Sequence, residues 1–258
     1  MQWIIQNSGI TFASLDNNVA PLVEAIDALG DARIAVGVIP FTDTIVGLEE
    51  VNRELPTLFY GSTRLVEIAS TLNFNPGVFY DKEWFFPNNW LGKRPDLLNE
   101  SQSYMTAGEL RKNWIDELFF VKSSDPKILT GMVLEGNIDQ SWWIEEYSHI
   151  SDDANLVISP VQEIEQEWRF FLIDGKIITG SQYKHNGILR IREPIPENIW
   201  KQAHRMSQYW IPSPNIVMDI AKMKDGSFKV VEWNCINASG WYNSTISSVI
   251  IALNSIYS

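Results

Sequence analysis

The chain has 258 residues, of which 45% are hydrophobic and 20% charged, a composition typical of a folded protein and not of a disordered one. A net charge of -12 argues against broad binding to bulk nucleic acid, which needs Lys and Arg on the phosphates. No apolar run is long enough to span a membrane, and a single cysteine excludes an internal disulfide and a cysteine-based zinc site. The N-terminal sequence MQWIIQNSGITF does not resemble a signal peptide, so we expect a reducing, cytoplasmic location.

The first third of the chain alternates strand and helix patterns. Four short apolar runs predict strands, at 3–5, 33–39, 57–60 and 78–80. Apolar residues recur at helical spacing over 19–29 and again over 65–72. Strands that alternate with helices indicate a parallel sheet with crossover connections. We therefore expect residues 1–106 to form a parallel α/β domain.

The pattern changes after a long connection. Residues 82–106 are rich in aromatic residues, proline and asparagine, without a clear period. From about residue 107 the sequence reads as hairpins with a few helices, which predicts an α+β domain over 107–258. The predicted strands lie at 119–121, 127–134, 156–159, 167–173, 176–183, 215–221 and 228–234. Two helices are expected, one that begins near Pro196 and one over 246–253.

One predicted hairpin carries two facing acids. The Asp-Gly pair at 225–226 supplies the positive φ angles of a tight turn. Counting outward from this turn places Asp219 opposite Glu232, and Asn234 lies on the same face as Glu232. Facing carboxylates repel each other unless a cation lies between them, and these oxygen ligands suit Mg²⁺ with a phosphate substrate. The alternative is a solvated hairpin face with two unrelated acids.

Two other strands carry charges that have two interpretations each. Glu167 and Arg169 share one face of a strand whose other face is strongly apolar, so their face is either exposed to solvent or the wall of a cleft. Lys122 ends an apolar strand beside a loop of small residues. It either holds a nucleotide phosphate as a point charge or is a surface lysine next to a turn.

Several common catalytic motifs are missing. The chain contains no GxxxxGK[ST] phosphate loop, and no GxGxxG follows the first strand. Met223 occupies the position of the lysine in the KxDG motif of covalent nucleotidyltransferases. No nucleophile elbow supports a serine triad, and the three histidines lack metal-ligand spacing, at positions 149, 185 and 204.

Taken in order, these motifs resemble those of the ATP-grasp superfamily of Mg²⁺- and ATP-dependent ligases, and especially a clade of short members common in phages and bacteria. The resemblance covers nearly the whole chain and is strongest in VKSSDPKILTG (121–131), SPVQEIEQEWRFFLIDGKIITGSQY (159–183) and VMDIAKMKDGSFKVVEWNCINASGWY (217–242). Upstream, FYGSTRLVEIA and NPGVFYD resemble the pre-ATP-grasp domain of that clade. An Asp on one strand and Glu-x-Asn on the next is the metal-binding signature of the superfamily.

The resemblance implies a role for each charged residue of these motifs. Asp219, Glu232 and Asn234 look like the ligands of one or two Mg²⁺ ions. Lys122 looks like the strand lysine that contacts the nucleotide phosphates, and Arg169 matches an arginine near the transferred phosphate. Both basic residues would therefore take part in catalysis.

The resemblance also implies the remaining contacts of ATP and substrate. The expected nucleotide-binding residues are Lys127, Thr130 and Gly131 in the loop over the phosphates, Ser159, Pro160 and Val161 in a hinge that recognises adenine, and Glu167 at the ribose. The expected substrate-facing residues are Tyr183, Lys184, Asn237 and Ser239. The phosphate loop is short and not glycine-rich, which departs from the pattern of the family.

The fold that the resemblance implies is an α/β pre-ATP-grasp domain, 1–106, followed by an α+β ATP-grasp domain with antiparallel sheets, 107–258, whose two subdomains meet at a hinge near 159–161. The activity it implies is ligation of a carboxylate to an amine, or less often a thiol, through an acyl phosphate. The expected partners are ATP, Mg²⁺ and small-molecule or peptide substrates, and no membrane.

Two other functions stay open. One is a non-catalytic or regulatory nucleotide-binding protein with the same fold. The other is a carbohydrate-active protein that would use the eleven tryptophans and the paired acids. Facing residues of a hairpin have Cβ atoms roughly 4.5–5.5 Å apart, which leaves little room for a sugar between them.

Overall fold

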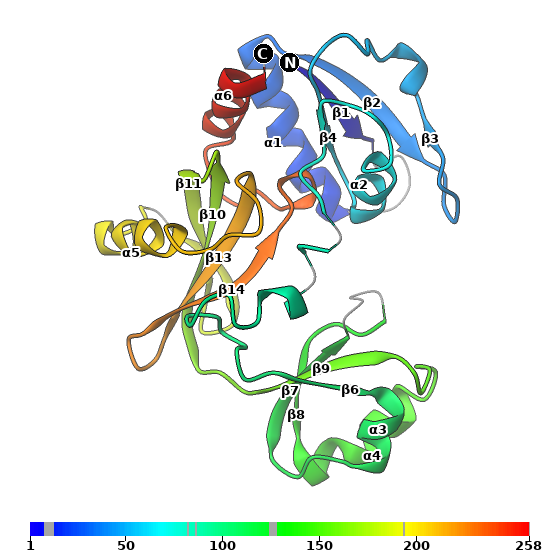
Figure 1. The fold of residues 1–258 in the computed structure, drawn as a ribbon, viewed down its shortest axis with the longest axis vertical. Helices are drawn as coiled ribbons and strands as arrows, with labels where there is room; N and C mark the ends of the chain where they lie inside the picture. The colour runs from blue at the N-terminus through cyan, green and yellow to red at the C-terminus, as the bar shows by residue number, and fades with distance from the viewer. Residues whose placement is uncertain (8–12, 82, 86, 124–127, 193, 258) are drawn as a thin grey trace.

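The computed structural model describes residues 1–7, 13–81, 83–85, 87–123, 128–192 and 194–257. The described strands form three sheets, which follow one another along the long axis of the molecule (Figure 1). The first sheet, at the top of the figure, carries both termini. The first sheet and the middle sheet both have five strands; from here on, the five-stranded sheet means the middle one, which is built from the C-terminal part of the chain. The four-stranded sheet lies at the bottom.

The first sheet is mixed, with strand order β3-β2-β1-β4-β5. Its strands are β1 (Gln2–Gln6), β2 (Ala32–Val38), β3 (Ile45–Val46), β4 (Thr57–Tyr60) and β5 (Pro76–Gly77). Only β3 is antiparallel to its neighbour, so the expected parallel arrangement is correct for the other four. The strand expected at 78–80 is wrong, because the edge strand β5 ends at Gly77. The short helix η1 (Leu48–Glu50) follows β3.

Two helices cover opposite faces of this sheet. Helix α1 (Ala13–Leu29) packs Leu22 and Ile26 against Trp3 and Ile5 of β1. Helix α2 (Thr63–Ala69) packs on the other face, where Ile4 of β1 points. Both helices begin near the carboxyl end of a parallel strand, as crossover connections do.

The four-stranded sheet is antiparallel, with order β6-β9-β7-β8. Its elements are η2 (Pro87–Trp90) before the sheet, β6 (Ser103–Thr106), α3 (Ala107–Lys112), β7 (Leu118–Ser123), β8 (Met132–Glu135), α4 (Gly136–Glu146) and β9 (Asn155–Pro160). Both helices pack on one face of the sheet, where they bury Leu110, Val121, Trp143 and Leu156. The connection expected over 82–106 therefore contains η2 and a strand, and β6 pairs with β9 although it precedes residue 107.

The five-stranded sheet is also antiparallel, with order β12-β11-β10-β13-β14. Its elements are β10 (Ile164–Ile173), β11 (Lys176–His185), β12 (Ile188–Arg192), α5 (Glu197–Ser207), β13 (Ile216–Met223), β14 (Phe228–Asn234), η3 (Ile236–Ala238) and α6 (Ile246–Tyr257). Asp174 and Gly175 both have positive φ, 52° and 71°, in the predicted tight turn between β10 and β11. Helix α5 covers one face of the sheet through Ile199, Ala203 and Met206.

The C-terminal segment joins the five-stranded sheet to the first one. Helix α6 contributes Val249, Ile250 and Leu253 to the same core as Trp3 and Leu22. The buried Trp241 stacks on Phe171 of β10, with ring centres 4.8 Å apart, and on Tyr60 of β4, with ring centres 5.4 Å apart. The α/β part and the adjacent antiparallel sheet therefore share one core. None of the described helices is long and apolar enough to cross a membrane.

Candidate functional site

Three adjacent strands bring charged residues onto one face of the five-stranded sheet. Arg169 of β10 pairs with Asp219 of β13, which pairs with Glu232 of β14. The neighbours of Arg169 and Asp219 along their strands, Trp168, Phe170, Met218 and Ile220, point to the other face, where they pack under α5. Glu167 and Arg169 are only 5% and 7% exposed, so their face is a buried wall and not a solvated surface. We call Glu167, Arg169, Asp219, Glu232 and Asn234 the charged band.

The facing acids Asp219 and Glu232 are paired as the sequence predicts, but the turn and the register of the hairpin between them differ from the prediction. The turn is one residue longer than a two-residue loop, because the Met223 N–H donates to Ser227 O and Lys222 pairs with Phe228. A bulge next to Val231 shifts the register by one residue and restores the pairing of Asp219 with Glu232. The two offsets cancel. A bulge places two residues of one strand opposite one of its partner, and Val231 packs beside Ala221 on the same side as the acids.

Asp219 has no exposed surface and is held by Arg169. The guanidinium donates to both carboxylate oxygens, from Nε at 2.9 Å and from Nη2 at 2.7 Å, and Nη1 donates to Gly240 O at 3.2 Å. Burial raises the pKa of Asp219; Arg169 lowers it only in part, and Glu232 and Glu167 raise it further. Burial opposes the charge of Arg169, yet Asp219 raises the pKa of the guanidinium above its ordinary value.

Glu167 lies in a second set of contacts beside this pair. The Tyr183 hydroxyl donates to Glu167 Oε2 at 2.7 Å, and Lys184 Nζ lies 3.3 Å from Glu167 Oε1. Burial raises the pKa of Tyr183, and the charges of Asp219 and Glu167 raise it further, so the phenol keeps its proton. The two predicted substrate residues of β11 are therefore in direct contact with the charged band.

The donor set at the hairpin fits Mg²⁺. Two carboxylates and a carboxamide provide oxygen ligands, which hard cations prefer. Asn234 Nδ2 lies 2.9 Å from Glu232 Oε1 and 3.4 Å from Asp219 Oδ2, so a positively polarised group already lies between the acids. A rotated amide would direct its oxygen to the same position. No group of three or more His, Cys, Asp or Glu side chains suited to a metal occurs among the described residues, so the amide would be an essential third ligand.

The same face of the five-stranded sheet becomes apolar toward the four-stranded sheet. Along β13, Val217 packs into the core shared with the first sheet, Asp219 lies in the charged band, and Ala221 and Met223 form an apolar cluster with Leu98. Strand β10 starts at this apolar end, directly after the junction at 159–161. One face thus offers an apolar surface and a charged surface side by side.

The four-stranded sheet faces this apolar end with the side that α3 and α4 leave uncovered. Val121 and Leu156 point into the helix-covered core, so Lys122 and Val157, which pair directly, point the other way. Tyr104 of β6 pairs with Val157 and extends the same row. Lys122 lines a small cavity together with Leu97, Leu98 and Val231, residues that belong to or pack on the five-stranded sheet. Lys122 therefore lies between the two sheets.

The other expected nucleotide contacts lie around this cavity or outside the described residues. Lys127 lies outside them, and Thr130 and Gly131 are exposed just before β8. Ser159 is buried, and its hydroxyl has no hydrogen-bond partner among the described residues. Pro160 and Val161 follow it where the chain passes from one sheet to the other.

Two predicted substrate residues instead join the sheets. Asn237 is fully buried; its Nδ2 donates to Phe59 O at 2.6 Å, and its Oδ1 accepts from the Phe79 N–H at 2.7 Å. Ser239 is also buried; its hydroxyl donates to Cys235 O at 2.6 Å, and its carbonyl oxygen accepts from the Tyr60 hydroxyl of β4 at 2.8 Å. Because their polar atoms are already bonded within the protein, we do not retain either residue in the candidate site.

The structure also adds residues that the sequence did not indicate. Tyr242 stacks on Tyr183 with ring centres 4.9 Å apart and lies over the Arg169 guanidinium. Tyr104 lies in one row with Lys122, and burial raises its pKa to about 12. Tyr242 lies inside a motif quoted above, whereas Tyr104 lies in the aperiodic connection, where no sequence signal singled it out.

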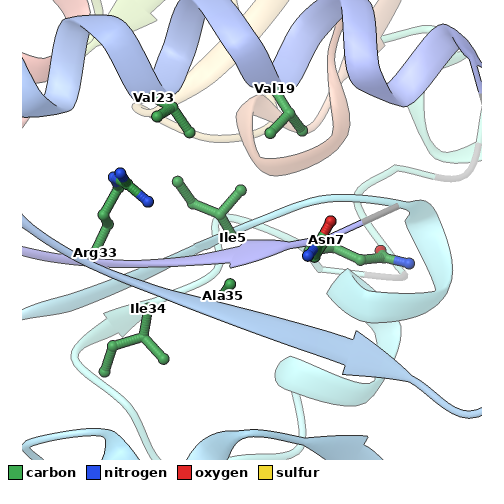
Figure 2. Close-up of a pocket in the computed structure, with 8 residues that line it drawn as sticks. Ile5, Asn7, Val19, Val23, Arg33, Ile34 and Ala35 are labelled. Atoms are coloured by element: carbon green, nitrogen blue, oxygen red, sulfur yellow. The ribbon is translucent and has the colours of Figure 1, made fainter. Parts of the chain in front are cut away.

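A larger cavity, of about 200 Å³, lies elsewhere (Figure 2). Val19 and Val23 of α1 face Ile5 of β1 across it, with Arg33 at one side. It contains none of the predicted site residues. The candidate site is therefore the charged band with its apolar extension, and not this cavity.

Comparisons with known proteins show the family and the fold of the chain. Residues 80–253 match a family of ATP-grasp domains, described as family 3 of its clade. This match includes every residue of the charged band. The search among curated proteins gave no match.

Solved structures of ATP-grasp enzymes have the same fold over their whole length. The D-cycloserine synthetase DcsG is 12% identical with a TM-score of 0.64, and all of both chains is covered. The D-alanine–D-alanine ligase of Bacillus anthracis complexed with ATP is 14% identical with a TM-score of 0.61, over 99% of this chain and 96% of that one. The ATP-grasp ligase PsnB complexed with a minimal precursor is 13% identical with a TM-score of 0.57, over 98% of each chain.

At these identities the likeness shows the fold alone, and it confirms the expected order of an α/β part followed by antiparallel ATP-grasp sheets. The family match covers well over half of the chain and includes Asp219, Glu232 and Asn234. The chain therefore belongs to the ATP-grasp superfamily. Within that superfamily, residues 80–253 place it in the ATP-grasp domain family named above.

Proposed function

We propose that the protein is an ATP- and Mg²⁺-dependent ligase that joins a carboxylate to an amine, or less often a thiol, and releases ADP. The observation that carries the proposal is the charged band on a buried sheet face, with Lys122 and an apolar cluster at one end. Burying this many charged residues on one sheet face costs folding free energy, and such charges are concentrated at functional sites. That the bound nucleotide is ATP is inferred from membership of the ATP-grasp superfamily.

The two halves of the face suit the two parts of ATP. The apolar cluster of Leu98, Ala221 and Met223 would take the adenine, next to the backbone at 159–161. Glu167 would accept a hydrogen bond from the ribose, since it lies between this cluster and the charged pair. Lys122 would contact the phosphates from the opposite sheet.

The reaction has two steps. A carboxylate oxygen of the first substrate attacks the γ-phosphorus of ATP, and the bond from phosphorus to the β–γ bridging oxygen breaks, which releases ADP. The amine then attacks the acyl carbon, phosphate leaves with the electrons of the acyl–oxygen bond, and the nitrogen loses a proton. Neither step needs a nucleophilic side chain, which agrees with the absence of a nucleophile motif.

The residues of the charged band would supply position and charge. Asp219, Glu232 and Asn234 would hold Mg²⁺, which when bound neutralises charge on the phosphate oxygens. Arg169 would stabilise the negative charge that develops on the transferred phosphate. Both Asp219 oxygens accept hydrogen bonds from Arg169, so Arg169 must give up part of this pairing when it turns to a phosphate.

The test is ADP release in the presence of candidate acid and amine pairs. We expect Asp219→Asn to lower Mg²⁺-dependent ADP release by at least about a hundred-fold, because it removes a charged ligand without changing the side-chain shape. Asp225→Asn is the matched control, since Asp225 is an exposed acid in the turn of the same hairpin and only caps Ser227. It should leave ADP release unchanged.

Three results would speak against the proposal. Full Mg²⁺-dependent turnover by the Asp219→Asn variant would exclude the metal site. An equal loss in the Asp225→Asn variant would point to a disturbed hairpin and not to a lost ligand. Tight binding of Mg·ATP by calorimetry, without turnover for any acceptor, would favour a regulatory nucleotide-binding protein.

A further inference from the structure

The segment between η3 and α6 presents one aromatic ring to the charged band. The Tyr242 ring stacks on Tyr183 with 6° between the ring planes, and the Arg169 guanidinium carbon lies 5.1 Å from its centre. Tyr183 in turn bonds Glu167. Tyr242 thus contacts Arg169, which binds Asp219, and Tyr183, which binds Glu167. Even so, 38% of the Tyr242 surface is exposed. The steps proposed above give this side chain no role.

The backbone of Tyr242 is strained. Its φ is 50°, in the left-handed region that a bulky aromatic residue rarely adopts. The other described non-glycine residues with positive φ are Phe41, Asp174 and Asn186, none of which contacts the charged band. Strain of this kind persists only where the surroundings impose it, and it is concentrated at functional sites.

The neighbours of Tyr242 impose this conformation. Trp241 is buried and stacks on Phe171, and its backbone N–H donates to Asn18 Oδ1 at 3.2 Å. On the other side the Asn243 N–H donates to Ser181 Oγ at 3.2 Å. Both flanking residues are therefore fixed to other elements. The segment holds the Tyr242 ring rigidly at the edge of the charged band.

The chemistry of the ring favours a cation. The face of a tyrosine ring attracts an ammonium group and does not attract a carboxylate. The cationic groups near it, Arg169 and Lys184, are already paired with acids and suit the carboxylate substrate. Burial raises the pKa of Tyr242; Arg169 and Lys184 lower it, and Asp219 and, least of all, the half-buried Glu232 raise it. Arg169 and Tyr183 already lie between this ring and the acids, so a further cation would approach the ring from its exposed side.

We propose that Tyr242 is a specificity-determining residue that binds the amine substrate, in its ammonium form, against the exposed side of its ring. The inference rests on the ligase function proposed above and assigns the side from which the amine enters. It also accounts for the strained backbone, because a relaxed residue at this position would direct its side chain elsewhere.

The experiment compares wild type with Tyr242→Gly and Tyr242→Phe in the ADP-release assay, with lysine, phenylalanine amide and putrescine as amines. Glycine adopts a φ of 50° without strain, so Tyr242→Gly removes the ring and does not threaten the fold. We expect it to raise the KM for the amine roughly ten-fold and to leave the KM for ATP unchanged. Tyr242→Phe keeps the ring face and should behave like wild type.

Tyr209→Ala serves as the matched control, because Tyr209 is also partly exposed, at 49%, but follows α5 on the other face of the sheet. It should change neither KM. An unchanged amine KM in Tyr242→Gly, with ADP still formed, overturns the role of Tyr242 and leaves the ligase function intact. A similar rise in both KM values indicates a purely structural role and also overturns it. A wild type that binds Mg·ATP and forms no ADP with any acid and amine overturns both proposals.

Discussion

The ion pair between Arg169 and Asp219 separates a structural from a functional interpretation of the charged band. A buried ion pair contributes little net stability compared with two packed apolar residues, but removing one partner costs about 3–5 kcal/mol. Its presence on an otherwise apolar strand therefore favours a function for these charges.

At the same scale, Cys235 shows how burial controls reactivity. Burial raises the pKa of this thiol from 9.0 to about 12, and backbone hydrogen bonds from Asn237 and Ala238 lower it only in part. A raised thiol pKa means less thiolate at every pH below 12, and only the thiolate reacts with alkylating agents.

We therefore expect the alkylation of native Cys235 by iodoacetamide to be slow and to keep rising with pH beyond 9, up to about 12. In urea the rate should level off near pH 9, as for an ordinary thiol. Mass spectrometry at a series of pH values measures both profiles. A native profile that levels off near pH 9 would contradict the burial of the thiol.

At the scale of elements, Arg94 links the connection after η2 to the end of α5 through hydrogen bonds and an ion pair. Its Nη2 donates to Asp96 Oδ2 at 2.7 Å and to Met206 O, in the last turn of the helix, at 3.0 Å. Arg94 is 2% exposed, so these contacts are shielded from water. A cation at a helix C-terminus also interacts favourably with the helix dipole.

We expect Arg94→Met to lower the free energy of unfolding by about 3 kcal/mol, because it leaves the Asp96 carboxylate without its guanidinium partner and removes hydrogen bonds to the Met206 and Trp210 carbonyl groups. The matched control is Arg33→Met, since Arg33 forms the same two-pronged contact with Asp27 on the surface. Its loss should cost less than about 1 kcal/mol. Urea unfolding of both variants measures the difference, and similar values for the two would refute the role of burial.

The hairpins are the elements that sequence reasoning located best. Asp174-Gly175 needed positive φ at both positions, which is a local requirement visible in two residues. The pairing of Asp219 with Glu232 was also predicted, although the bulge at Val231 was not. A bulge depends on which face Val231 packs against, and that packing involves Leu98, far away in the sequence.

Helices α3 and α4 were missed for physical reasons. Helix α3 has six residues, too few for a period of 3.6 to be visible. The apolar residues of α4 do not form one stripe, because Trp143 is buried whereas Ile138 and Trp142 are exposed. Strand β12 was missed because all of its residues are exposed, and a strand without a buried face shows no alternation.

At the scale of the whole molecule, the cores do not coincide with the boundary expected at residue 106. The first sheet, the five-stranded sheet and α6 share one core, whereas the four-stranded sheet has its own core under α3 and α4. Asn237 adds hydrogen bonds between η3 and the first sheet. We infer that residues 103–160 form one folding unit and the rest of the described chain another.

This arrangement predicts that residues 103–160 exchange their amide hydrogens separately from the rest. Native-state hydrogen exchange in increasing urea should show one opening transition for this segment and another, shared one, for the first and five-stranded sheets. A fragment of residues 107–258 should not fold stably, because it lacks β6 and the partners of Phe171 and Trp241. A stable fragment with native circular dichroism would restore the boundary at 106.

The sequence by itself determined the order of the α/β and antiparallel parts, the hairpins, and the residues of the charged band. These features depend on alternation along single strands and on turn chemistry, both of which are local. Only the tertiary structure decided that the band is buried, that Asn237 and Ser239 join sheets, and that Tyr242 lies over Arg169. The physical reason is that burial and side-chain contacts arise from segments far apart in the chain, such as Tyr60, Phe171 and Trp241 in one stack.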